Sequence, residues 1–180
     1  MRDIPVFTTE NGIASLVLKE IPYRGEAYII LRDTQCPDAF LKECVEFCTA
    51  VGADKIYAKG NDLLGRYPLH TVIWQMQRQK NGIPETDASV FPVKEKTIDR
   101  WSSLYNEKMK NISNAATMTR MDCEKLIKRG KAYFVHRGGV VLGIGVAEGD
   151  TIETVIAEKR GYGKDVLLAM CSILFSDCIR

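Results

Sequence analysis

The clearest chemical feature of this chain is a glycine-bearing basic loop that lies between a predicted strand and a predicted helix. Residues 158–165 read EKRGYGKD, follow the β-branched run 151–157 and precede the apolar run 166–175. Gly161 and Gly163 would let the backbone approach an anion closely, and Arg160 and Lys164 add positive charge. Backbone N–H groups at the start of a helix, reinforced by the helix dipole, favour a phosphate or a pyrophosphate. The alternative is a tight strand-to-helix turn that binds no ligand.

Two common phosphate-binding motifs are excluded at this loop. The P-loop pattern G-x-x-x-x-G-K-S/T is missing, and the dinucleotide pattern G-x-G-x-x-G would need a third glycine where Val166 stands. Metal chemistry is also not expected, because the six cysteines include no C-x-x-C pair and the chain has two histidines. We expect buried, reduced thiols and no metal site.

The elements that must position this loop follow from hydrophobic periodicity and turn residues. The first half predicts two strands within 13–32, a helix over 38–51, and strands over 55–58 and 69–76. The second half predicts a strand near 89–93, a helix from Ile98 to Ile112, a short helix capped by Asp122, strands over 132–136, 140–147 and 151–157, and a helix over 166–175. Trp74 and Trp101 are predicted to lie in the core. Residues 79–88, rich in Gly, Pro and small polar residues, are the predicted linker between a unit of residues 1–78 and a unit of residues 89–180.

The segment VIAEKRGYGKDVLLA, residues 155–169, resembles the acetyl-CoA-binding motif of the GNAT N-acetyltransferases. That motif is a strand ending in V-x-P, then Arg/Gln-x-x-Gly-x-Gly/Ala, then an apolar helix. Arg160 and Gly163 stand at the Arg/Gln and first Gly positions. Ala157 replaces the proline, and Asp165 occupies the second Gly/Ala position. The order of predicted elements from about residue 89 onward is similar to the family's.

This resemblance implies an α/β fold, GNAT-like, with a mixed, largely antiparallel sheet flanked by helices on both faces. It implies acetyl-CoA as co-substrate, with no metal. The backbone of Val155 and Ala157 would pair with the pantetheine amides, and the pyrophosphate would lie on the amides of Gly161, Tyr162, Gly163 and Lys164. Asp165 would place a carboxylate near the pyrophosphate or would cap the helix.

The implied activity is acetyl transfer to a primary amine of a small molecule or a protein. A substrate amine must lose a proton before it attacks the thioester, so a base is needed. The candidate bases are Glu153, in the motif strand, and Glu148, in the preceding turn. The alternative for each is an ordinary solvated strand or turn residue without a catalytic role. Tyr67 is the candidate acid that protonates the departing thiolate. This role is implied by a resemblance to the C-terminal part of the family fold, which is carried by the helix 38–51, the strand 55–58, Asn61 and Tyr67. Tyr162 is an alternative.

Three alternatives follow from the departures from the family pattern. The chain could be a catalytically inactive GNAT-like module that binds an acyl-CoA or a protein. It could continue naturally beyond Arg180, where the family has further strands and a tyrosine-bearing helix. The two halves could complete one composite sheet, the arrangement we favour because open sheet edges promote aggregation, or could be two GNAT-like half units.

Composition limits the classes of protein. The chain is 46% hydrophobic and 27% charged over 180 residues, which is typical of globular proteins and excludes disorder as the main state.

The N-terminal sequence lacks the apolar core of a signal peptide, and no apolar run is long enough for a membrane span, so we expect a cytoplasmic protein. Residues 91–180 hold 15 basic and 11 acidic side chains, which suits a small anion better than nucleic acid. Unpaired sheet edges would favour a homodimer.

Overall fold

The computed structural model describes residues 4–60, 64–79, 81–113, 115–174 and 178–179. The chain divides into two compact units, Met1–Val72 and Ile73–Arg180. Each unit has its own four-stranded sheet; one buried apolar cluster packs on the sheet of the first unit and two on that of the second.

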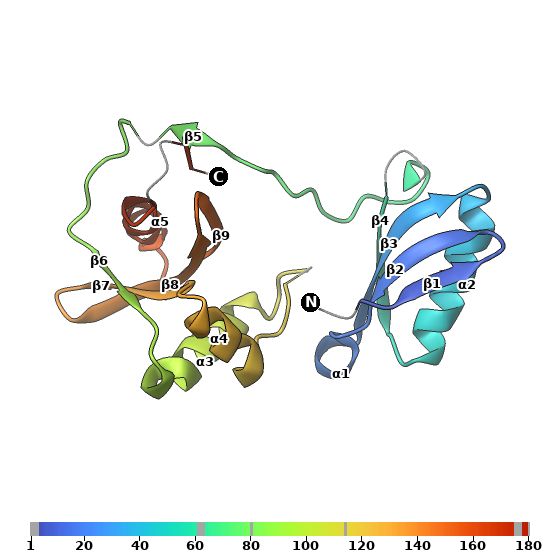
Figure 1. The fold of residues 1–180 in the computed structure, drawn as a ribbon, viewed down its shortest axis with the longest axis horizontal. Coiled ribbons are helices and arrows are strands. Elements are labelled where there is room, and N and C mark those ends of the chain that lie inside the picture. Colours follow the sequence, from blue (N-terminus) through green and yellow to red (C-terminus); the bar gives the residue numbers. More distant parts are fainter. Residues whose placement is uncertain (1–3, 61–63, 80, 114, 175–177, 180) are drawn as a thin grey trace. The chain divides into compact units, whose positions relative to one another are not determined.

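The first unit is a four-stranded sheet with one long helix. Its elements are β1 (Val6–Thr9), β2 (Gly12–Val17), α1 (Ile21–Arg24), β3 (Glu26–Thr34), α2 (Pro37–Ala50) and β4 (Lys55–Lys59). The sheet order is β1-β2-β3-β4, with β4 parallel to β3 and the other pairs antiparallel. The apolar stripe of α2 packs on one face through Phe40, Leu41, Cys44 and Cys48, all of them buried (Figure 1).

The second unit contains the predicted motif. Its elements are β5 (Arg78–Gln79), β6 (Ser89–Pro92), η2 (Glu95–Thr97), α3 (Ile98–Met109), α4 (Arg120–Lys128), β7 (Ala132–Arg137), β8 (Val140–Glu148), β9 (Thr151–Ala157), α5 (Gly163–Ser172) and β10 (Cys178–Ile179). The main sheet has the order β6-β7-β8-β9, and each neighbouring pair is antiparallel. β5 and β10 form a separate antiparallel pair.

Helices cover both faces of the β6–β9 sheet (Figure 1). On one face Trp101 and Tyr105 of α3 and Cys123 of α4 pack against Ile144 of β8. On the other face α5 contributes a second cluster that includes Val166 and Met170. The structure therefore confirms the predicted α/β fold class, a mixed and largely antiparallel arrangement with helices on both faces.

The start of α4 differs from the prediction that Asp122 caps it. Thr119 is the N-cap: its Oγ1 accepts a hydrogen bond from the Asp122 N–H at 3.2 Å, and the Asp122 carboxylate accepts one from the Thr119 N–H at 3.3 Å. This reciprocal pair is a capping box, in which the acidic residue stands three positions after the cap.

The close approach of α5 to the sheet depends on a glycine in β8. A Cβ atom at Gly143 would collide with the Ile156 carbonyl oxygen and would lie 2.8 Å from Cγ2 of Val166. Gly143→Ala is therefore expected to lower the free energy of unfolding by about 1–3 kcal/mol, the usual cost of overpacking, as measured by urea denaturation. Gly163→Ala is the matched control, because a Cβ there meets no atom within 4 Å. Equal stability of the two variants would contradict this packing.

The strand predicted over residues 69–76 is wrong. No described sheet includes these residues, and Trp74, predicted to be core, is 81% exposed. The β-branched and aromatic residues of this segment favour a strand, but a strand forms only where a neighbouring strand pairs with it. The sequence reading also missed β1 and the short pair β5–β10.

The cysteines mostly agree with the prediction of buried thiols. Cys44, Cys48, Cys123 and Cys171 are buried, whereas Cys36 is exposed. Burial raises the pKa of Cys44 and of Cys123 to about 11.

Two predictions about domain organisation remain predictions: the linker at residues 79–88, and the arrangement in which the two halves form one composite domain. Asn61, which the resemblance compared with the family's tail, lies outside the described residues.

Candidate functional site

The predicted phosphate loop is a tight turn between β9 and α5. The Glu158 N–H donates to the Leu142 carbonyl at 2.9 Å, which extends the strand pairing one residue past β9. Gly161 then adopts φ +97°, a left-handed conformation that favours glycine. The Tyr162 N–H donates to the Lys159 carbonyl at 3.3 Å and closes the turn. α5 begins at the next residue.

The first turn of α5 is open to solvent. Gly163, Lys164 and Arg160 are exposed, and apart from adjacent residues and the helix backbone no atom lies within 4 Å of the position that a Cβ on Gly163 would take. The first N–H groups of an α-helix have no partner within the helix, so they are available to an anion there. Tyr162 differs from the other predicted amide donors, because its N–H donates to the Lys159 carbonyl within the turn and its partly buried side chain packs against the α5 cluster.

Asp165, the acidic departure from the family motif, is ion-paired. Its Oδ1 lies 3.0 Å from Nη2 of Arg137, which extends from β7, and Nε of the same guanidinium lies 2.7 Å from Oδ1 of Asp87. The hydrogen bond to Asp165 is the main cause that raises the pKa of Arg137. Arg137 therefore offsets the negative charge that Asp165 brings to the first turn of α5. No sequence pattern linked residues 137 and 165.

Val155 and Ala157 lie near the C-terminal end of β9. They pair with Gly145 and Gly143 of β8. Because they are two residues apart in an extended strand, their backbone polar groups point in the same direction. Within the described residues β8 is the only strand that pairs with β9.

Glu153 is the extra residue of a β-bulge. Val146 pairs with Thr154 and Ala147 pairs with Ile152, so Glu153 has no opposite residue on β8. Bulges redirect side chains and are frequent beside active sites. Glu153 lies about 13 Å along β9 from Ala157, at roughly 3.3 Å per residue.

A buried lysine joins the two predicted bases. Lys131, which precedes β7, is 7% exposed, and its ammonium binds the Glu148 carboxylate and lies 3.9 Å from Oε1 of Glu153. The structure therefore brings Glu148 and Glu153 together. Sequence reasoning missed Lys131, because a lysine beside a glycine at the start of a strand is usually a solvated residue.

Tyr67 lies in the first unit. Its hydroxyl donates to Oδ1 of Asp38 at 3.1 Å, and Nη1 of Arg66 lies 2.6 Å from the other oxygen of that carboxylate. Partial burial and then the hydrogen bond with Asp38 raise the pKa of Tyr67. Every contact that the structure describes for Tyr67 is made within its own unit, and none of them is with Glu148 or Glu153.

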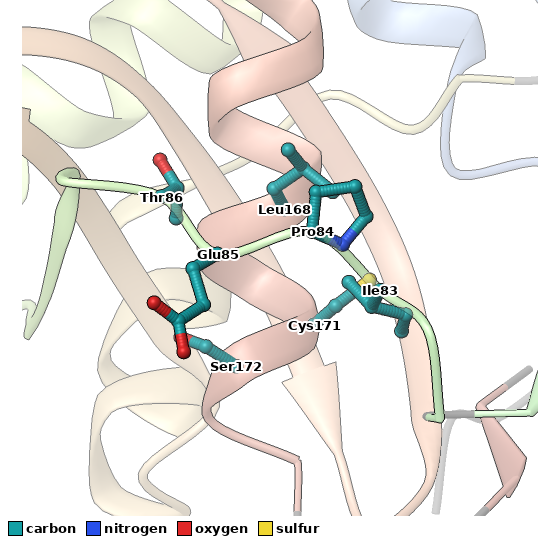
Figure 2. A pocket seen from close by; sticks show the side chains of 7 residues that line it. All are labelled: Ile83, Pro84, Glu85, Thr86, Leu168, Cys171 and Ser172. Atoms are coloured by element: carbon teal, nitrogen blue, oxygen red, sulfur yellow. The ribbon is translucent and has the colours of Figure 1, made fainter.

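A separate pocket of about 320 Å³ lies over α5. Figure 2 shows the chain at Ile83–Thr86 crossing the helix beside Leu168, Cys171 and Ser172. None of the predicted cofactor-binding or catalytic residues lines it. The pocket therefore does not belong to the predicted donor site.

Two further findings concern metals and membranes. The described part of the chain contains no group of three or more His, Cys, Asp or Glu side chains that could hold a metal ion. In the same residues no helix combines the length and the apolar character needed to cross a bilayer.

Comparisons with known proteins give a distant structural neighbour. No protein-family model matches the chain, and no curated protein matches it. A solved structure that aligns with it is a C-terminal domain (DUF2156) from Agrobacterium fabrum, named after lysylphosphatidylglycerol synthetase. The alignment has a TM-score of 0.39 and 10% sequence identity, covers 94% of this chain and spans 66% of the neighbour's length.

Proposed function

We propose that the second unit binds acetyl-CoA and transfers its acetyl group to a primary amine of a small molecule or a protein. The observation that carries this proposal is the open first turn of α5. There the left-handed Gly161 lies between the exposed residues Arg160 and Lys164, and Arg137 offsets the charge of Asp165. A helix start of this kind favours a pyrophosphate. The order of strands and helices around it supports a GNAT-like arrangement.

In this proposal each part of the site has one role. The amides of Gly161, Gly163 and Lys164 hold the pyrophosphate, with Arg160 as an additional cation. The backbone of Val155 and Ala157 pairs with the pantetheine arm, which directs the thioester along β9 toward Glu153. A thioester bound there supplies an activated acetyl group.

The proton transfers are assigned to the glutamates. Glu153 or Glu148 accepts a proton from the substrate ammonium, directly or through water. The amine nitrogen then forms a bond to the acetyl carbonyl carbon, and the carbon–sulfur bond breaks. The nitrogen loses its second proton as it becomes an amide, and this loss balances the proton that the departing thiolate takes up. Tyr67 remains the proposed proton donor from the family resemblance. Tyr162 is less suited to that role, because its ring packs against α5.

Calorimetric titration of acetyl-CoA into the protein tests the site. Wild type is expected to bind acetyl-CoA. Gly163→Ala, whose methyl group would enter the space left for the pyrophosphate without changing the charge, is expected to bind more weakly than wild type and more tightly than Gly163→Asp. Gly163→Asp is expected to bind at least about 100-fold more weakly, since like charges brought together cost several kcal/mol. No heat with millimolar acetyl-CoA, or unchanged binding by Gly163→Asp, would refute the proposed site.

The second candidate is a module that binds an acyl-CoA without transferring the acyl group. The engagement of both glutamates by the buried Lys131 favours it, because carboxylates that contact an ammonium of the protein are less free to contact a substrate amine. An amine screen on protein that binds acetyl-CoA separates the two. Acetyl transfer that falls about 100-fold or more in Glu153→Gln or Glu148→Gln supports the enzyme. Binding without transfer to any amine supports the module.

A further inference from the structure

Lys131 is a buried primary amine that lies beside both candidate bases. Its side chain is 8% exposed, its ammonium contacts the Glu148 carboxylate, and its Nζ lies 3.9 Å from Oε1 of Glu153. The function proposed above gives Lys131 no part in the reaction. An amine within reach of a carboxylate base is nevertheless the arrangement that acetyl transfer needs at its acceptor.

The backbone fixes the position from which this side chain extends. The Lys131 N–H donates to the Leu126 carbonyl at 3.0 Å, and the Lys131 carbonyl accepts from the Ala147 N–H at 3.0 Å. The buried stem then ends against two carboxylates whose side chains are about half exposed. The ammonium therefore lies directly beneath the surface, and it becomes accessible when those carboxylates turn outward.

The proposed path of the cofactor leads to the same place. In the proposed function the pantetheine arm pairs with Val155 and Ala157 and runs along β9 toward Glu153. Glu153 lies in the bulge and has no opposite residue on β8. Among the described residues, the ion pair printed for Glu153 is the one with Lys131. A thioester delivered to Glu153 would therefore meet a primary amine of the protein itself.

We propose that Lys131 is an acceptor of the acetyl group, so that the chain acetylates its own Nζ; this inference rests on the acetyl-CoA site proposed above. Glu153 or Glu148 takes one proton from the ammonium and passes it to solvent. Nζ forms a bond to the carbonyl carbon of the thioester, and the carbon–sulfur bond breaks. The nitrogen loses a second proton as it becomes an amide, and the departing thiolate takes up one proton. The products are acetyl-lysine and free coenzyme A.

The surroundings of Lys131 can accommodate this product. Acetylation replaces a buried charge by a neutral amide, so no charge is left in the interior without a partner. The two carboxylates that lose the ammonium are about half exposed and stay solvated. We therefore expect the modified chain to remain folded, with both glutamates released from the ion pair.

Mass spectrometry after incubation with acetyl-CoA tests the proposal, with Lys42 of α2 as a control in the same molecule. Nζ of Lys42 also lies 3.9 Å from a glutamate oxygen, Oε1 of Glu46, but its side chain is 79% exposed and belongs to the first unit. Direct chemical acetylation would favour Lys42, because its amine is open to solvent. Transfer from a bound cofactor is expected to acetylate Lys131 at least about 100-fold faster than Lys42.

A tryptic digest locates the modification. Trypsin does not cleave after acetyl-lysine, so modified Lys131 appears in the uncut peptide GKAYFVHR, residues 130–137. In Lys131→Arg, which keeps the positive charge without a primary amine, this acetylated peptide is expected to be absent. At least one of Glu153→Gln and Glu148→Gln is expected to slow acetylation of Lys131 by about 100-fold. Each of these two variants keeps one carboxylate beside the ammonium, and circular dichroism verifies that each is folded.

Calorimetry on the same samples separates this proposal from the proposed function. The first-order rate constant is expected to be independent of protein concentration, because amine and thioester belong to one complex. Three results would overturn self-acetylation and leave the acetyl-CoA site standing, provided that acetyl-CoA binds: equal rates at Lys131 and Lys42, a rate constant that rises with protein concentration, or an unchanged rate in both glutamate variants. Absence of binding would refute both proposals.

Discussion

Trp101→Ala is expected to lower the free energy of unfolding by about 3–5 kcal/mol, the usual cost of truncating a fully buried tryptophan. The indole of Trp101 is completely buried, stacks on Tyr105 with a ring-centroid separation of 5.6 Å, and donates from Nε1 to the Tyr133 carbonyl at 3.0 Å. Its removal would leave a cavity between α3 and the sheet and a carbonyl without that donor. Urea denaturation followed by circular dichroism measures the change.

Trp74→Ala is the matched control, because the same chemical change falls on an 81% exposed side chain. It is expected to change the free energy of unfolding by no more than about 0.5 kcal/mol. Similar losses for both tryptophans would contradict the packing described for α3.

Glu148→Gln combined with Glu153→Gln is expected to lower the free energy of unfolding by about 3 kcal/mol. The double change leaves the buried Lys131 ammonium without an opposite charge. We expect the lower end of the range for a broken buried ion pair, because both carboxylates remain about half exposed. Each single variant keeps one carboxylate beside Lys131 and is expected to lose less. Urea denaturation at neutral pH gives the values.

Lys131→Met added to the double variant provides the decisive comparison. Methionine has a similar length and no charge, so most of the lost stability is expected to return. A double variant as stable as wild type, or a triple variant no better than the double, would show that Lys131 does not depend on these glutamates. The result also bears on function: activity losses in the single variants can be assigned to proton transfer only if those variants remain folded.

The order of α3, α4, α5 and the strands β6 to β9 in the second unit was predictable from sequence. The apolar stripe of α3, the turns at residues 137–139 and 148–150, and the β-branched runs of β8 and β9 each depend on residues close together in the chain. Hydrophobic periodicity and turn chemistry act over such short distances. The glycine-bearing loop before α5 was identified for the same reason, because its geometry depends on Gly161 and on the helix that follows.

The partners of charged side chains were not predictable. Arg137 reaches Asp165 across 28 positions of sequence, and Lys131 reaches Glu148 across 17. Nothing local to either residue specifies such a contact; strand register and helix docking bring the groups together. The same holds for Glu153, whose place in a bulge follows from a shift in the pairing of β8 with β9.

The two tryptophans show where local pattern ends and tertiary structure begins. Both lie in apolar segments, and the sequence by itself determined that each segment could form regular structure. Only the tertiary structure decided that Trp101 would be buried, because α3 docks on a sheet, and that Trp74 would be exposed, because no described strand pairs with residues 69–76. Burial depends on what the rest of the chain places opposite a residue, and that information is spread over the whole fold.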